Sequence, residues 1–428
     1  MTLDLLRFTT AGSVDDGKST LIGRLLFDTQ QLFDDQLEAV SVASRRRGIG
    51  EMDLSLVTDG LRAEREQGIT IDVAYRYAAT PTRKYIIADC PGHVQYTANM
   101  ATGASTADLA LVVVDVTSGL REQTRRHTCI AALLGVDQLV VVANKMDLVD
   151  WDRDAYESVA QQMGALARRL SIESCTVVPI SALHGDNVVE RSDAAPWYDG
   201  PTVLQALEGA PAGGWAAVHG AHVGTGARLP VQWVLRHGGG RSYAGIVGGG
   251  RLRPGDEVVV LPSGQRTTVT AITTYDGSLD EAPVGMSVSV DLAQDIDVSR
   301  GDLIASADGP PLVTSDIEAT VCWFGNRALR KGDRLRVKHT TRVTPARVTE
   351  VLSRFDVNDL TLVDADELAD NEIGVVRLAT GTPLAVDPYR TNRVTGSFVL
   401  VDEATNATLA ACMVGAPPLA ESHIHLVR

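Results

Sequence analysis

The first half of the chain alternates short aliphatic runs with longer segments in which apolar residues recur every three or four positions. The short runs have the length of buried strands, and the longer segments have the period of amphipathic helices. The expected strands are 5–11, 85–89, 109–115, 139–144 and 175–180, and the expected helices are 18–27, 124–134 and 154–170. This alternation predicts a doubly wound α/β domain with a mostly parallel sheet.

The second half has a different pattern. Past residue 228 the helical period is lost, and short runs rich in Val, Thr and Leu are separated by turn sequences such as RPGD and YDGS. Such spacing is typical of all-β barrels, and the prolines of 308–312 divide this half in two. The sequence therefore predicts a first domain over 1–209, a linker over 210–227, and β-barrels over 228–307 and 314–428.

Length and charge agree with this division. At about 150 residues per domain, 428 residues predict about three domains, which excludes a small disulfide scaffold. The formal net charge of −15 excludes neutralisation of a nucleic-acid backbone as a general source of affinity. No nucleic-acid partner is expected, since one would need a local basic patch.

Cysteine usage and hydropathy point to the cytoplasm. Five scattered cysteines without a CxxC pair predict neither disulfides nor a zinc site. The N-terminus lacks the basic and apolar regions of a secretory signal. The longest apolar runs are far shorter than the ~18 residues of a membrane helix, so no membrane association is expected.

A phosphate-binding motif lies at 12–19. The sequence GSVDDGKS fits GxxxxGK[ST] and stands between an expected strand and an expected helix. Its backbone N–H groups and the helix N-terminus would surround phosphate oxygens. Lys18 would reach the β- and γ-phosphates of a nucleotide, and the Ser19 hydroxyl would ligate Mg²⁺.

A second motif, DCPGH at 89–93, follows the strand expected at 85–89. Asp89 at the strand end would hold Mg²⁺, and Gly92 would turn its N–H toward the γ-phosphate. His93 would orient the attacking water. A lone histidine is more often structural, but the adjoining Asp and Gly favour a catalytic role here.

The sequence NKMD at 144–147 follows another expected strand and predicts the base. A carboxylate at Asp147 accepts hydrogen bonds from the N1–H and 2-amino groups of guanine, whereas adenine has neither donor there. Asn144 and Lys145 would brace the loop, and the lysine stem would cover the base. The SAL sequence (Ser181, Ala182 and Leu183) would offer backbone N–H groups to the guanine oxygen.

The nucleotide is therefore expected to be GTP, with Mg²⁺. The residues expected to bind its phosphates are Gly12, Ser13, Val14, Asp15, Asp16, Gly17, Lys18, Ser19, Thr20 and Gly92. In QGITID at 67–72, Thr70 would ligate Mg²⁺ while a γ-phosphate is present and release it afterwards. The catalytic residues are thus expected to be Lys18, Thr70 and His93. The arginines before this motif equally suit a solvated helix face, so no arginine finger is assigned.

With these motifs in this order, the chain resembles the translation-factor class of GTPases, which carry a G domain and two β-barrels. Three stretches, 12–28, 93–127 and 392–413, more closely resemble the large, GTP-hydrolysing subunit family of sulfate adenylyltransferase (ATP sulfurylase). The phosphate loop departs at Ser13 and Asp16 from elongation factors, in which it usually reads GHVDHGK.

This resemblance implies a heteromeric enzyme of sulfate assimilation. The family's small subunit forms adenosine 5′-phosphosulfate and pyrophosphate from ATP and sulfate, and GTP hydrolysis on the large subunit drives that step. The chain has one phosphate loop and neither an HxGH nor an SGGxDS pattern, so a small adenylating subunit is the expected partner. The sequence HGAH at 219–222 lacks the glycine that HxGH requires.

Two alternatives remain open. The chain could be an elongation-factor-like GTPase that delivers aminoacyl-tRNA, which the phosphate-loop departures at Ser13 and Asp16 disfavour. It could also be a generic GTP-dependent scaffold.

Overall fold

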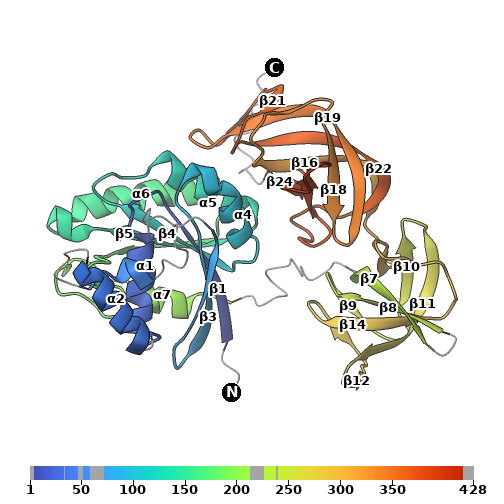
Figure 1. Cartoon of the computed structure of the whole chain (residues 1–428), viewed down its shortest axis with the longest axis horizontal. Helices are drawn as coiled ribbons and strands as arrows, with labels where there is room; N and C mark the ends of the chain where they lie inside the picture. The colour runs from blue at the N-terminus through green and yellow to red at the C-terminus, as the bar shows by residue number, and fades with distance from the viewer. Residues whose placement is uncertain are drawn as a thin grey trace. The chain divides into compact units, whose positions relative to one another are not determined.

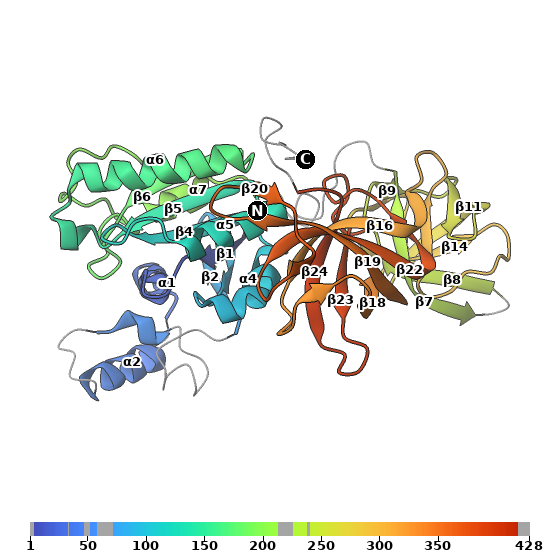
Figure 2. The same cartoon turned by 90° about the horizontal axis from the view of Figure 1, so that it is seen from above.

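The computed structural model describes residues 4–32, 34–46, 52–57, 72–212, 226–237 and 240–417. These residues form two units, each described here by itself (Figures 1 and 2). The first unit is an α/β domain and the second consists of two β-barrels. The predicted fold class is confirmed.

A six-stranded sheet of order β2-β3-β1-β4-β5-β6 forms the centre of the first unit. All neighbours pair in parallel except β2, which runs antiparallel to β3 at one edge. The strands are β1 (Asp4–Ala11), β2 (Ala74–Ala79), β3 (Arg83–Asp89), β4 (Leu109–Asp115), β5 (Gln138–Asn144) and β6 (Ser174–Pro179). Every residue of β4 is buried, as expected of a central strand covered on both faces.

Helices cover both faces of this sheet (Figure 1). They are α1 (Lys18–Asp28), α4 (Thr97–Ala104), α5 (Glu122–Leu133), α6 (Arg153–Arg169) and α7 (Val203–Gly209). Helix α2 (Asp34–Arg46) lies farther from the sheet, beside the 3₁₀ turn Leu54–Val57 (Figure 2), and two more 3₁₀ turns span Val94–Tyr96 and Met146–Val149. The leucines of α1 and α7 share one apolar core with inward side chains of β1 and β3. The packing of α1 fixes the direction in which it leaves the loop at its N-terminus.

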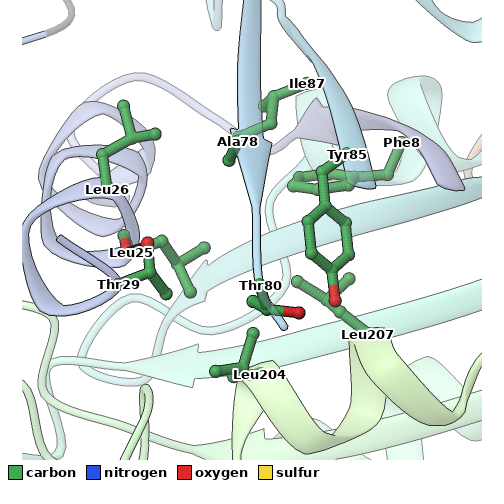
Figure 3. A pocket seen from close by; sticks show the side chains of 10 residues that line it. All are labelled: Phe8, Leu25, Leu26, Thr29, Ala78, Thr80, Tyr85, Ile87, Leu204 and Leu207. Atoms are coloured by element: carbon green, nitrogen blue, oxygen red, sulfur yellow. Dashed lines mark hydrogen bonds between the residues drawn. The ribbon is translucent and has the colours of Figure 1, made fainter. Parts of the chain in front are cut away.

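A small apolar pocket lies at the other end of α1, between this helix, β2, β3 and α7 (Figure 3). Leu25, Leu207, Phe8 and Tyr85 are among its lining residues. Burial raises the pKa of the Tyr85 hydroxyl to about 12. An 11-residue helix spans about 16 Å, so this pocket is separate from the loop that precedes α1.

The second unit contains two seven-stranded sheets, each closed into a barrel by one additional pairing, β10 with β11 and β18 with β19. The first barrel contains β7 (Arg228–His237), β8 (Gly240–Ile246), β10 (Glu257–Leu261), β11 (Gln265–Thr274), β12 (Gly277–Ser278), β14 (Ser287–Leu292) and β15 (Leu303–Ser306), beside the short pair β9 (Arg251–Leu252) and β13 (Ala282–Pro283). The second contains β16 (Leu312–Trp323), β18 (Arg334–His339), β19 (Arg342–Asp356), β20 (Thr361–Val363), β22 (Ile373–Val386), β23 (Ser397–Val401) and β24 (Thr408–Val414), beside β17 (Leu329–Arg330) and β21 (Glu367–Leu368).

A buried ion pair joins the two barrels. The Arg228 guanidinium at the start of β7 donates to both carboxylate oxygens of Asp387, at 2.9 and 3.1 Å. The Thr395 hydroxyl donates to the same carboxylate at 2.6 Å. Because both charged side chains are buried, each depends on the other for compensation.

Candidate nucleotide site

The loop at 12–17 connects β1 to α1 and turns through backbone conformations that favour glycine. Gly12 has φ 141° and Gly17 has φ 97°. A Cβ atom on Gly12 would lie 2.5 Å from the Val113 carbonyl oxygen, and one on Gly17 would lie 2.3 Å from Nδ2 of Asn144. Both glycines are therefore required for the close approach of this loop to the ends of β4 and β5.

Lys18, the first residue of α1, is buried beneath this loop. Its ammonium group donates to the carbonyl oxygens of Ser13 at 2.6 Å and Gly12 at 3.2 Å. Burial lowers the pKa of Lys18, and the nearby carboxylates of Asp16 and Asp89 oppose this shift. Two backbone carbonyl groups of the loop thus hold the Lys18 ammonium in place.

An open pocket lies above the loop. It brings together most of the expected phosphate-binding residues with residues from three other segments. The lining residues are Val14, Asp15, Gly17, Lys18, Ser19, Thr20, Ser55, Gly92, His93 and Lys145. Ser55 was not expected from the sequence, because no motif marks it.

Three of the expected phosphate-binding residues do not line this pocket. Gly12, Ser13 and Asp16 belong to the loop itself and are buried. The Ser13 N–H donates to Oδ2 of Asp16 at 2.6 Å, so this loop N–H is already bonded within the protein. The role of these three residues in phosphate binding stays a prediction.

The oxygen donors near Lys18 suit a hard divalent cation. Asp89 is buried at the end of β3, where its carboxylate accepts a hydrogen bond from the Thr10 hydroxyl at 3.3 Å, and Ser19 lines the pocket. Carboxylate and hydroxyl oxygens are ligands that Mg²⁺ prefers. The third expected ligand, Thr70, lies outside the described residues. Within the described ranges no three His, Cys, Asp or Glu side chains cluster as a metal site.

Gly92 and His93 reach the pocket from the loop after β3. A Cβ atom on Gly92 would lie 2.5 Å from the Lys18 ammonium and 3.0 Å from the Ser13 carbonyl, so the two loops are in close contact. The half-buried His93 ring packs edge-to-face on Tyr96, with centroids 6.2 Å apart. This contact orients the imidazole at the rim of the pocket. Its action on water stays a prediction.

Asn144, at the end of β5, joins three loops. Its side-chain amide donates to the Asp16 carbonyl at 2.8 Å, and its Oδ1 accepts from the Ala182 N–H at 3.0 Å. The next residue, Lys145, forms an ion pair with Asp115 at 2.7 Å. Burial raises the pKa of Asp115, but hydrogen bonds from Lys145 and Thr117 outweigh it, so the pKa lies below its ordinary value.

The expected base-recognition residues lie in the loops after β5 and β6. Asp147 is half-buried in the 3₁₀ turn that follows Lys145. The Arg24 side chain of α1 donates to the carbonyl oxygens of Ala182 and Leu183, at 3.4 and 2.5 Å, and orients the SAL loop. The N–H of Ser181 donates to the Asp186 carbonyl at 3.3 Å. Direct contact of these residues with guanine stays a prediction.

Helix α5 contacts the underside of the phosphate loop through side chains outside the recognised motifs. The hydroxyls of Thr124 and Ser13 lie 3.0 Å apart, and the Gly12 N–H donates to Nδ1 of His127 at 3.4 Å. Burial lowers the pKa of His127 to about 3, so the ring is neutral and Nδ1 accepts. Three-residue spacing places both side chains on one helix face, which is the only sequence signal that could have revealed them.

The chain is similar to known GTP-binding proteins over most of its length. Residues 3–211 match the family described as Elongation factor Tu GTP binding domain, and residues 316–415 match the GTP-eEF1A C-terminal domain-like family. The chain is 49% identical over 413 residues to "Sulfate adenylyltransferase subunit 1" of Aeromonas hydrophila, covering 96% of this chain and 86% of that protein. The protein of the same description from Laribacter hongkongensis is 49% identical over 417 residues, covering 96% and 85%.

A longer relative is similar over the same region. "Bifunctional enzyme CysN/CysC" of Mycobacterium tuberculosis (strain CDC 1551 / Oshkosh) is 53% identical over 417 residues, covering 96% of this chain and 67% of that protein. In the part of the chain that the structure describes, no helix has the length and apolar character needed to cross a membrane.

Proposed function

The chain belongs to the sulfate adenylyltransferase subunit 1 family, and we propose that GTP hydrolysis in its first domain drives sulfate adenylation on a partner subunit. The family resemblance inferred from the sequence is confirmed. The observation that carries the proposal is the phosphate-loop pocket in a chain that aligns with this family over nearly its whole length. Delivery of aminoacyl-tRNA is not favoured, because these relatives are described as sulfate adenylyltransferase subunits.

Lys18 and His93 take different parts in the proposed hydrolysis. The ammonium of Lys18 binds the β- and γ-phosphates in place of the loop carbonyls that it contacts here. The His93 imidazole orients the attacking water at the rim of the same pocket. Gly92 lets its loop approach close enough for its N–H to meet the γ-phosphate.

Ser19, Asp89 and Thr70 hold Mg²⁺ in this proposal. When bound with the nucleotide, Mg²⁺ neutralises charge that develops on the phosphate oxygens. Ser19 supplies a hydroxyl at the pocket wall, and the buried Asp89 supplies a carboxylate at the end of β3. Thr70 would ligate Mg²⁺ only while the γ-phosphate is present, which would make the nucleotide state readable by a partner.

Asp147 selects guanine in the same proposal. Its carboxylate accepts from N1–H and the 2-amino group, while Asn144 and Arg24 fix the loops around the base. The Lys145 stem covers one face of the base, and the SAL loop contributes an N–H to the guanine oxygen.

The proposed partner is a small subunit that forms adenosine 5′-phosphosulfate and pyrophosphate from ATP and sulfate. The chain shows one nucleotide pocket of the phosphate-loop type within its described residues, which supports a division of labour. The five cysteines are free thiols, which supports function in the reducing cytoplasm.

The proposal is tested with the purified chain alone and with its partner. The chain alone should bind GTP and GDP, hydrolyse GTP slowly, and form no adenosine 5′-phosphosulfate from ATP and sulfate. It should co-purify with the small subunit, and the complex should hydrolyse GTP faster. Formation of adenosine 5′-phosphosulfate by the isolated chain would refute the division of labour.

A further inference from the structure

Arg121 is the residue immediately before α5. Its side chain contacts a backbone carbonyl and a carboxylate of the phosphate loop. Its guanidinium donates to the Val14 carbonyl at 3.2 Å and lies 4.0 Å from a carboxylate oxygen of Asp16. The other end of the guanidinium donates to the Ser118 hydroxyl at 2.7 Å. The Arg121 side chain is 44% exposed, whereas that of Asp16 is 3% exposed. A surface arginine thus reaches a buried carboxylate of the loop.

Asp16 places a buried negative charge within a loop that binds anionic phosphates. Burial raises the pKa of this carboxyl, against the lowering effects of the Ser13 N–H and of the Lys18 and Arg121 cations. An uncompensated carboxylate at this place would repel the phosphates of a nucleotide. Its charge therefore has to be balanced by a cation that the phosphates do not use.

Among the residues that the structure describes, the charged groups around Asp16 leave one cation for this role. Lys18 faces it from α1, Arg121 from the start of α5, and Asp115 from the end of β4. Lys18 is needed at the phosphates, and Lys145 is engaged by Asp115 at 2.7 Å. Arg121 remains as the cation that can balance Asp16 while a nucleotide is bound.

We propose that Arg121 is a positioning residue for nucleotide binding, which neutralises Asp16 and fixes the Val14 carbonyl so that the phosphate loop accepts GTP and GDP. The inference rests on the proposed GTP site and is independent of the sulfate-adenylating partner. The phosphate loop of this chain carries a carboxylate at Asp16. Arg121 is the basic side chain that makes a carboxylate tolerable at that position.

The test is a double-mutant cycle on the full chain, read as the equilibrium dissociation constant for GDP. Arg121→Ala should weaken GDP binding by about tenfold, less than the loss of a fully buried cation would cause, because the Arg121 side chain is 44% exposed and its charge is partly screened. Asp16→Asn removes the carboxylate charge, so adding Arg121→Ala to it should cost about twofold or less. Arg153→Ala, which breaks the exposed pair with Glu157, is the matched control and should leave GDP binding unchanged.

A pH series separates charge balance from a purely structural role. In Arg121→Ala, protonation of Asp16 removes the unbalanced charge, so the deficit relative to wild type should shrink as the pH is lowered. Comparison with wild type at each pH cancels the titration of the nucleotide itself. Since protonation favours binding here, the deficit has to be largest at high pH.

Each outcome decides the inference. Unchanged GDP affinity in Arg121→Ala would overturn it, as would an equal loss in the Asp16→Asn background or a deficit that does not vary with pH. Arg121→Lys keeps the charge and should retain most of the affinity, so it separates charge loss from misfolding. Failure of the wild-type chain to bind GTP or GDP at all would instead refute the proposed function.

Discussion

The side-chain amide of Asn144 donates to the backbone carbonyl of Asp16 across 2.8 Å and so ties the base-recognition loop to the phosphate loop. The same buried side chain accepts the Ala182 N–H at 3.0 Å. Gly17 permits this approach, because any Cβ there would collide with the Asn144 amide. In the proposed site, phosphate binding and base recognition would therefore depend on one shared residue.

Replacement of Asn144 should disturb both halves of the nucleotide site. Asn144→Ala leaves the Ala182 N–H and the Asp16 carbonyl without their partner, a loss of about 1–3 kcal/mol for each buried group left unsatisfied. We expect GTP and GDP affinity to fall together by at least about tenfold, together with the melting temperature. Calorimetric titration and thermal unfolding measure both. Gln162→Ala, which removes an exposed hydrogen bond to Ser158, should change neither.

Asp147 should determine which base is bound. Asp147→Asn replaces an acceptor with a donor, so preference should shift from guanine toward xanthine nucleotides, whose 2-oxo group accepts a hydrogen bond. Competition of GTP, XTP and ATP against a labelled guanine nucleotide measures the shift. Wild-type protein should discriminate against ATP by about a thousandfold or more, since a carboxylate left unpaired against the base adds to the lost bonds. Equal wild-type affinity for ATP and GTP would contradict this account.

Lys18 and His93 should separate binding from chemistry. Lys18→Ala removes a charge that binds phosphates in the ground and transition states alike, so nucleotide affinity itself should fall. His93→Ala should keep near-normal GTP affinity while single-turnover hydrolysis falls by about a hundredfold, the scale of one positioned catalytic group. Unchanged hydrolysis in the His93 variant would make this histidine structural, and a matching loss of affinity would make it a binding residue.

The buried ion pair between Arg228 and Asp387 gives a prediction about the stability of the second unit. Arg228→Ala leaves the Asp387 carboxylate buried without its cation, which should lower the free energy of unfolding of the barrel unit by about 3–5 kcal/mol. Arg377 forms ion pairs with Glu318 and Glu350 at the barrel surface, so Arg377→Ala should cost about 1 kcal/mol or less. Denaturant unfolding of the full chain compares the two variants. Equal losses would show that burial of the Arg228 pair does not matter.

The sequence predicted an element correctly where its hydrophobic signal was strong. The expected strand 109–115 coincides with β4, because its seven residues are all buried and mostly aliphatic. The ends of α1, α5 and α6 lie within two residues of the expected helices. By contrast, β2 was not predicted, because it is a short edge strand whose alternating exposed tyrosines give little hydrophobic signal. The small residues of α4 likewise leave its helical period weak.

The motifs located the candidate site, but not the contacts that hold it together. Lys18, Gly92 and His93 were predicted from sequence patterns, and the structure brings them to one pocket. The bond from Asn144 to Asp16 joins residues 128 positions apart. The contact of Arg121 with Val14 spans 107 positions. Such contacts depend on how the sheet brings loop ends together, so no local pattern encodes them.

The central claim is that GTP hydrolysis in this chain drives sulfate adenylation on its partner. The most direct measurement reconstitutes the chain with the small subunit and follows adenosine 5′-phosphosulfate formed from ATP and sulfate, alongside GTP hydrolysed. We expect product to accumulate in proportion to GTP hydrolysed, and to stay near its small GTP-free level with a non-hydrolysable analogue or with His93→Ala. Equal product formation with GTP, with the analogue and without nucleotide would contradict the account.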